Sequence, residues 1–60
     1  MDRAEIESDI TFCTERAAYC QSMASHAVEK NDLQIASDWL DAALNWHELT
    51  TELKQELANA

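Results

Sequence analysis

The sequence of 60 residues contains no glycine and no proline, the two residues that most often interrupt helices. Their absence favours long, unbroken helices. No apolar run approaches the ~20 residues that cross a bilayer, which argues against a membrane span. The first residues, through Glu5, also lack the basic flank and apolar stretch of a signal peptide. We therefore expect a cytoplasmic protein that binds no membrane.

Basic residues are scarce, with 4 Lys and Arg against 12 Asp and Glu and a formal net charge of -8. Proteins bind nucleic acids largely through Lys and Arg side chains that displace counterions from phosphates, so we expect no direct nucleic-acid binding. Hydrophobic residues nevertheless make up 47% of the chain, more than a disordered acidic segment carries. The composition therefore predicts a folded acidic protein.

Two cysteines and two histidines form the one candidate set for zinc: Cys13, Cys20, His26 and His47. Cys13 and Cys20 are about 10 Å apart along a helix, whereas two ligands from one helix need a spacing of three or four residues. In an antiparallel pairing, His47 falls near Glu15 and Arg16, away from both thiols. A nucleophilic cysteine would need an electropositive setting, and the surroundings are acidic and apolar. We expect no metal, no cofactor and no enzymatic activity.

Small and apolar residues recur in the first half of the chain in alternating steps of four and three: Ile6, Ile10, Cys13, Ala17, Cys20, Ala24 and Ala27. This heptad pattern is typical of a helix that packs along one side. Asp2 with Glu5 predicts a capping box, and residues 29–32 form the one cluster of helix breakers, with Asn31 suited to a left-handed C-cap. We predict helices at about 3–29 and 33–58, a turn at about 30–32, and a single domain over 1–60.

The second half carries two neighbouring stripes. The first stripe continues the steps of four and three: Ile35, Trp39, Ala42, Trp46, Leu49 and Leu53. The second stripe lies one residue along: Ala36, Leu40, Ala43 and His47. Antiparallel pairing predicts that the bulky residues of the first stripe face the small residues of the first helix, so that the two helices approach closely.

Two helices alone do not cover both stripes, so Trp39 and Trp46 would stay partly exposed in a monomer. We therefore predict an all-α fold, an antiparallel two-helix hairpin that forms a homodimer with the architecture of a four-helix bundle. The residues expected to contact a second copy or another partner are large and apolar: Phe12, Tyr19, Met23, Trp39, Trp46, Leu49 and Leu53.

Acidic residues line one side of the second helix, and we name them the acidic stripe: Asp38, Asp41, Glu48, Glu52 and Glu56. One interpretation is a solvated helix face. The other is mimicry of nucleic acid, in which carboxylates imitate phosphates. The stripe has about one charge per 5 Å of helix, sparser than the one per ~3.4 Å of a DNA strand, which favours the solvated face.

The segment 31–44 resembles the second helix of a tetratricopeptide repeat. Ala36, Leu40 and Ala43 stand where that family has small, large and small residues, and Ala24 matches the small residue of its first helix. No proline follows the segment, and both predicted helices are longer than those of a repeat. The resemblance implies a helical hairpin whose surface serves protein recognition.

These features together predict a non-enzymatic homodimer that acts by binding another protein, as a small adaptor or regulator. The alternative is an acidic inhibitor or DNA mimic that docks on a basic or DNA-binding target. Small acidic helical chains are also similar in general character to accessory proteins of bacteriophages and mobile elements. Binding that survives high salt would favour an apolar interface, and steep loss would favour the acidic stripe.

Overall fold

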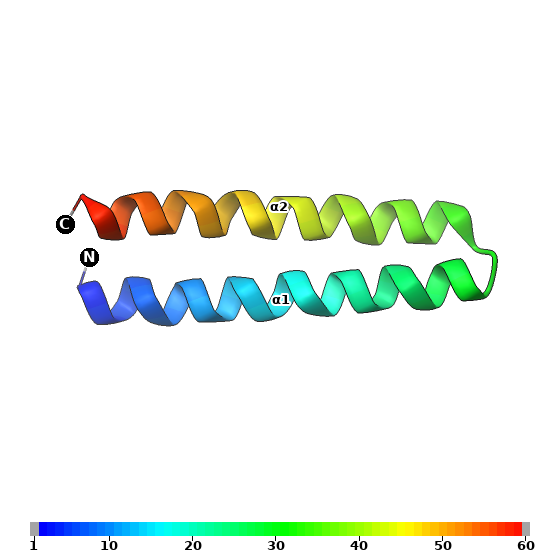
Figure 1. Ribbon diagram of the computed structural model, residues 1–60, viewed down its shortest axis with the longest axis horizontal. Helices are drawn as coiled ribbons and strands as arrows, with labels where there is room; N and C mark the ends of the chain where they lie inside the picture. The colour runs from blue at the N-terminus through cyan, green and yellow to red at the C-terminus, as the bar shows by residue number, and fades with distance from the viewer. Residues whose placement is uncertain (1, 60) are drawn as a thin grey trace.

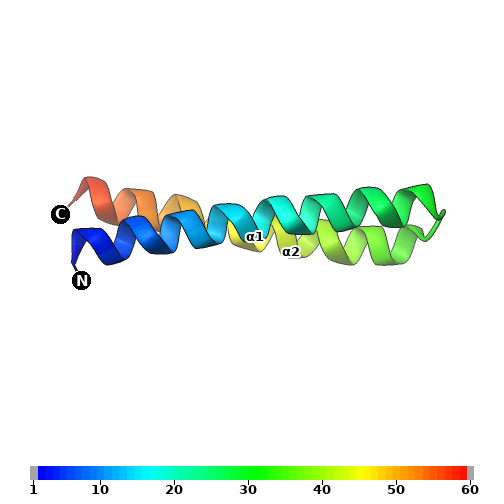
Figure 2. The same ribbon diagram turned by 90° about the horizontal axis from the view of Figure 1, so that it is seen from below.

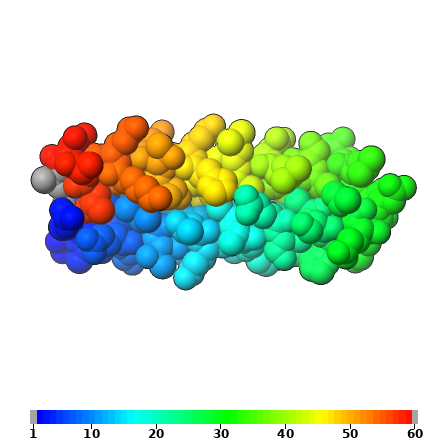
Figure 3. All heavy atoms as spheres, viewed as in Figure 1, coloured from blue at the N-terminus to red at the C-terminus, as the bar shows by residue number. Residues whose placement is uncertain are grey.

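The computed structural model describes residues 2–59 and consists of two antiparallel helices, α1 (Arg3–Glu29) and α2 (Leu33–Ala58), joined by a short turn (Figure 1). The pair measures 44 × 14 × 12 Å between Cα atoms. The helices cross when seen from the side (Figure 2), and they touch along their whole length in the space-filling view (Figure 3). The predicted all-α helical hairpin is confirmed. Over the described residues, neither helix is both long and apolar enough to cross a membrane.

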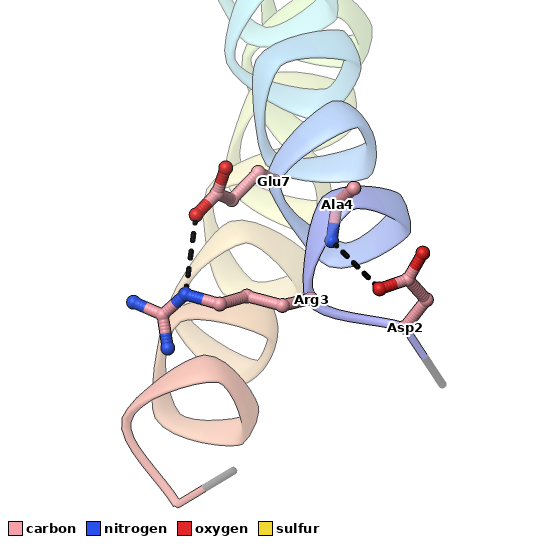
Figure 4. A network of polar contacts seen from close by, with 4 residues as sticks. All are labelled: Asp2, Arg3, Ala4 and Glu7. Atoms are coloured by element: carbon pink, nitrogen blue, oxygen red, sulfur yellow. Dashed lines mark hydrogen bonds and ion pairs between the residues drawn. The ribbon is translucent and has the colours of Figure 1, made fainter.

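The first helix begins at an aspartate cap. Asp2 is extended, and its carboxylate accepts a hydrogen bond of 3.4 Å from the backbone N–H of Ala4 (Figure 4). The Asp2 carbonyl accepts from the N–H of Ile6 at 3.1 Å, which starts the helical ladder. Arg3 pairs with Glu7 one turn along at 3.5 Å, but both side chains are exposed, so the pair stabilises the helix only weakly.

The turn is built on Asn31, whose φ of 59° lies in the left-handed region. The N–H of Asp32 donates to the carbonyl of Ala27 at 2.8 Å, and the N–H of Asn31 donates to that of Val28 at 2.9 Å. These two bonds form a Schellman motif, which satisfies the last carbonyls of α1 and reverses the chain without glycine. Asp32 is the N-cap of α2, but its side chain makes no capping hydrogen bond.

The two helices meet along a seam of small residues. The buried residues of α1 are those of the heptad pattern apart from Ile10, which is partly buried: Ile6, Cys13, Ala17, Cys20, Ala24 and Ala27. At the end of the hairpin away from the turn, Ile6, Cys13 and Leu53 form a cluster, and Trp46 and Leu57 pack against it. Alanine and cysteine side chains let the backbones approach closely, so the core is long and narrow rather than thick.

The predicted pairing of bulky residues against the small seam is wrong for part of α2. Ala36, Ala43 and Thr50 are buried, whereas Ile35 and Leu49 remain 46% and 39% exposed. The seam of α2 shares Trp39, Trp46 and Leu53 with the predicted stripe, but it has the next residue in the chain in place of Ile35, Ala42 and Leu49. Its members are buried or partly buried: Ala36, Trp39, Ala43, Trp46, Thr50, Leu53 and Leu57. Close backbones leave no room for Ile35 or Leu49 between them. The Thr50 hydroxyl enters the seam because it donates to the Trp46 carbonyl at 2.9 Å.

Candidate functional site

The seam divides the surface of the hairpin into two long faces. Each helix has one buried line of residues, with an exposed flank on either side of it. Because the helices are antiparallel, the equivalent flanks of α1 and α2 lie on the same side of the molecule. One flank carries the rings and bulky side chains, and we name it the aromatic face: Phe12, Tyr19, Met23, Ile35, Trp39, Trp46 and Leu49. The opposite flank carries aliphatic residues, and we name it the leucine face: Val28, Leu33, Leu40 and Leu44.

Two pairs of rings join the helices across the aromatic face. The rings of Phe12 and Trp46 are 5.8 Å apart at 82°, and those of Tyr19 and Trp39 are 5.8 Å apart at 84°. Both pairs have the edge-to-face geometry that aromatic rings prefer, worth about 0.5–1.5 kcal/mol each beyond the buried area. The guanidinium carbon of Arg16 lies 4.9 Å from the centre of the Tyr19 ring. The rings of Phe12 and Tyr19 nevertheless remain 56% and 47% exposed.

A shallow pocket of about 200 Å³ opens at the turn end of the aromatic face. Met23, Ile35 and Trp39 supply its apolar walls, and Lys30 and Asp32 lie at the turn. Its volume is below the ~300 Å³ at which pockets for drug-sized ligands begin. The pocket therefore suits an inserted side chain better than a separate small molecule.

The structure brings together most of the residues that the sequence predicted as an interface. Six of them share the aromatic face, and the seventh, Leu53, lies in the hairpin core instead. Ile35 joins the aromatic face because it is excluded from the seam. Trp39 and Trp46 are partly buried by their contacts with Tyr19 and Phe12.

The leucine face was not predicted from the sequence. Its four aliphatic side chains are 54% to 64% exposed and come from both helices near the turn. On the same flank, Nε2 of Gln21 and Nε2 of His47 lie within hydrogen-bonding distance, 3.2 Å apart across the seam. The sequence does contain a pattern for this face, because Leu33 and Leu40 are seven residues apart and Leu40 and Leu44 are four apart, which places the three leucines on one side of a helix. It becomes visible only when Ala36 and Ala43 define the seam.

The acidic stripe lies on the exposed surface of α2, and its members are all open to solvent. Asp38 accepts a hydrogen bond of 3.1 Å from the Gln34 amide one turn before it. The ion pairs found over residues 2–59 are Arg3 with Glu7 and His26 with Glu29, so none neutralises the stripe. Neither of these two ion pairs involves a residue of the stripe.

The thiols and imidazoles do not converge. Cys13 and Cys20 are free and buried in the seam. Nε2 of His47 lies beside Gln21, and His26 lies near Glu29 at 3.9 Å. Across the part of the chain that the structure describes, no three His, Cys, Asp or Glu side chains are grouped to hold a metal ion. The two cysteines therefore act as packing residues in this hairpin.

No protein-family model, curated protein or solved structure matches the chain. The likeness to a tetratricopeptide repeat is therefore one of helical pattern. In the hairpin, Ala36 and Ala43 are buried where the helices meet, while Leu40 is exposed on the leucine face.

Proposed function

We propose that this chain forms a homodimer with the architecture of a four-helix bundle and acts, without enzymatic activity, by binding another protein as a small adaptor or regulator. The observation that carries the proposal is the aromatic face, a continuous row of rings and aliphatic side chains that the hairpin leaves partly open. Aromatic residues and methionine are enriched in the buried centres of protein interfaces.

The small size of the hairpin core supports a second copy. Most of its buried apolar residues are alanine and cysteine, and only Ile6 and Leu53 are large. A single core in a chain of this size seldom supplies more than ~3–5 kcal/mol, and small helical proteins commonly gain the rest by oligomerisation. Covering the aromatic face would bury side chains worth about 1.5–3 kcal/mol each when fully removed from water.

The dimensions of the hairpin also suit a dimer. A face of 44 by 14 Å covers roughly 600 Å² on each copy, so that two copies bury roughly 1,200 Å², the lower end of specific interfaces. Two such hairpins stacked face to face make four helices around one core, with antiparallel neighbours if the two-fold axis runs along the bundle.

Charges at the edges of the aromatic face favour this arrangement. Arg16 and, at the turn, Lys30 lie on its α1 side, which also carries Glu5 and Asp9 nearer the N-terminus, and Asp38 and Glu52 lie on its α2 side. A two-fold axis along the bundle sets α1 of one copy against α2 of the other. Arg16 and Lys30 of each copy then face the side of the partner that carries Asp38 and Glu52, which offsets part of the repulsion between copies that each carry a net charge of -8.

The dimer is tested by sedimentation equilibrium on a matched pair of variants. Leu49→Glu places a charge on the aromatic face, and Leu44→Glu makes the same change on the leucine face of the same helix. We expect the wild type and Leu44→Glu to sediment as dimers at micromolar concentration and Leu49→Glu as a monomer, with helical circular dichroism in all three. A folded wild-type monomer at that concentration would overturn the homodimer.

The uncompensated acidic stripe supports a second candidate function, an acidic inhibitor or DNA mimic that docks on a basic or DNA-binding target. Asp41 and Glu48 have no ion-pair partner over residues 2–59, so they are free to pair with cations of another protein. Binding through the stripe alone would weaken steeply between 50 and 500 mM salt, because salt screens the attraction between exposed charges. The screening length is ~10 Å at 0.1 M salt and becomes shorter as the salt concentration rises. Binding through an apolar face would change little over that range.

A further inference from the structure

We propose that the leucine face is a docking site for a basic amphipathic helix of a partner protein. The proposal names the partner chemistry of the function proposed above and rests on it for the premise that the chain binds protein. It assigns the two faces different occupants, a second copy on the aromatic face and a foreign helix on the leucine face.

The leucine face has the shape that an amphipathic helix requires. Leu33, Leu40 and Leu44 follow one flank of α2 over roughly 16 Å, the length of three helical turns. Val28 extends the face onto α1 at the turn end. These four residues are all more than half exposed. A helix with apolar residues at i, i+3, i+4 and i+7 presents a matching stripe.

The charges around the leucine face identify the partner as basic. Asp41 and Glu48 lie on the outward side of the face, at positions adjoining Leu40 and Leu44. Lys54 on the same flank is ten residues beyond Leu44, about 15 Å along the helix, and Arg3, which pairs with Glu7, lies at that same end of the hairpin. Lysine or arginine at the edge of a docked helix would meet the carboxylates of Asp41 and Glu48 on α2.

The same charges argue against a second copy on this face. Two leucine faces brought together would set Asp41 and Glu48 of each copy near the same acids of the other, whereas the basic residues of this flank, Lys54 and the Arg3 that pairs with Glu7, lie at the end away from the turn. Like charges across an interface suppress association. The aromatic face differs because its margins carry both signs, through Arg16 and Lys30 on one edge and Asp38 on the other.

The test uses a fluorescently labelled synthetic helix of about 18 residues, five turns, with leucine at i, i+3, i+4 and i+7 and lysine at the flanking positions. A peptide of the same composition in scrambled order is its control. Binding is followed by fluorescence anisotropy at 50 and 500 mM salt. We expect the amphipathic peptide to bind at least tenfold more tightly than the scrambled peptide and to retain measurable affinity at the higher salt.

Variants locate the binding. We expect the double variant Leu40→Ser, Leu44→Ser to lose at least tenfold in affinity, and Leu49→Ser on the aromatic face to change it less than twofold. The double variant Asp41→Asn, Glu48→Gln should weaken binding severalfold at 50 mM salt and flatten its salt dependence. Circular dichroism must show that each variant remains helical, and Leu40→Ala replaces the first double variant if it does not.

Three results would overturn the proposal. Equal binding of the scrambled peptide, or loss only with the charge variant, would reduce the interaction to general attraction between opposite charges. A larger loss with Leu49→Ser would move the peptide to the aromatic face. Sedimentation of the same samples separates the two claims, because a monomeric wild type that still binds peptide through Leu40 and Leu44 would overturn the homodimer and leave the leucine face supported.

Discussion

The two long faces of the hairpin both expose apolar side chains, yet they are built differently. On the aromatic face, Trp39 and Trp46 belong to the helix seam and are held edge-to-face by Tyr19 and Phe12. On the leucine face, aliphatic side chains lie outside the seam and are more than half exposed. Changes on the aromatic face therefore affect both folding and association, whereas changes on the leucine face should affect association alone.

The comparison also shows why apolar area does not by itself choose a partner. Both faces offer surface that gains from leaving water, and the hydrophobic effect is not directional. In the proposed assembly the charged margins distinguish the two faces, because mixed charges beside the aromatic face permit a second copy and the acids beside the leucine face disfavour one. In a chain with 12 acids and 4 bases, the positions of the few basic residues decide which face can meet a second copy.

The largest effect should come from truncating Trp46, which joins the aromatic face to the core cluster. Trp46→Ala removes the contact with Phe12 and the packing against Ile6, Cys13 and Leu53. We expect a loss of about 3 kcal/mol in the free energy of unfolding, measured by urea denaturation, together with loss of the dimer. Leu44→Ala is the control, and its effect on unfolding should stay within about 0.5 kcal/mol. Equal losses for both variants would contradict the distinction between the faces.

The next effect concerns the seam that separates the faces. Ala43 is buried where α2 approaches α1, so Ala43→Leu forces the helices apart and should destabilise the hairpin by about 1–3 kcal/mol. Ala18→Leu adds the same atoms at an exposed position of α1 and should change stability little. Thermal unfolding of the two variants at equal concentration measures the difference. A destabilised Ala18→Leu with an unchanged Ala43→Leu would place the seam elsewhere.

The seam also marks the limit of what the sequence predicts. The alternating steps of four and three identify the buried line of α1, and the breakers around Asn31 identify the turn, because each signal has one physical meaning. On α2, two stripes one residue apart compete. If the stripe with the larger side chains is assumed to be buried, Ile35 and Leu49 are placed between the helices. The small residues of α1 instead bring the two backbones so close that Ala36 and Ala43 are buried at the interface. That outcome depends on both helices together.

The same ambiguity hid one of the candidate sites. The rings of the aromatic face could be grouped from the sequence because Trp39 and Trp46 belong both to the first predicted stripe and to the observed seam. Leu33, Leu40 and Leu44 could not, since in the predicted stripes Leu40 shares a line with Ala36 and Ala43. A shift of one residue, about 100° around a helix, decides whether a side chain lies in the seam or on a face.

The smallest effect should come from the turn, which serves both faces equally. Asn31 has a φ of 59°, so Asn31→Ala should cost about 1 kcal/mol because alanine has no side-chain amide to favour the left-handed region. Asn31→Gly adopts that conformation without steric cost and should be neutral or slightly stabilising, and it is the matched control. Urea denaturation measures both. The turn connects both helices and belongs to neither face. A variant at Asn31 should therefore weaken dimerisation and peptide binding only by lowering the fraction of folded protein. A variant that lost one of these two activities alone would show that the turn contributes directly to that face.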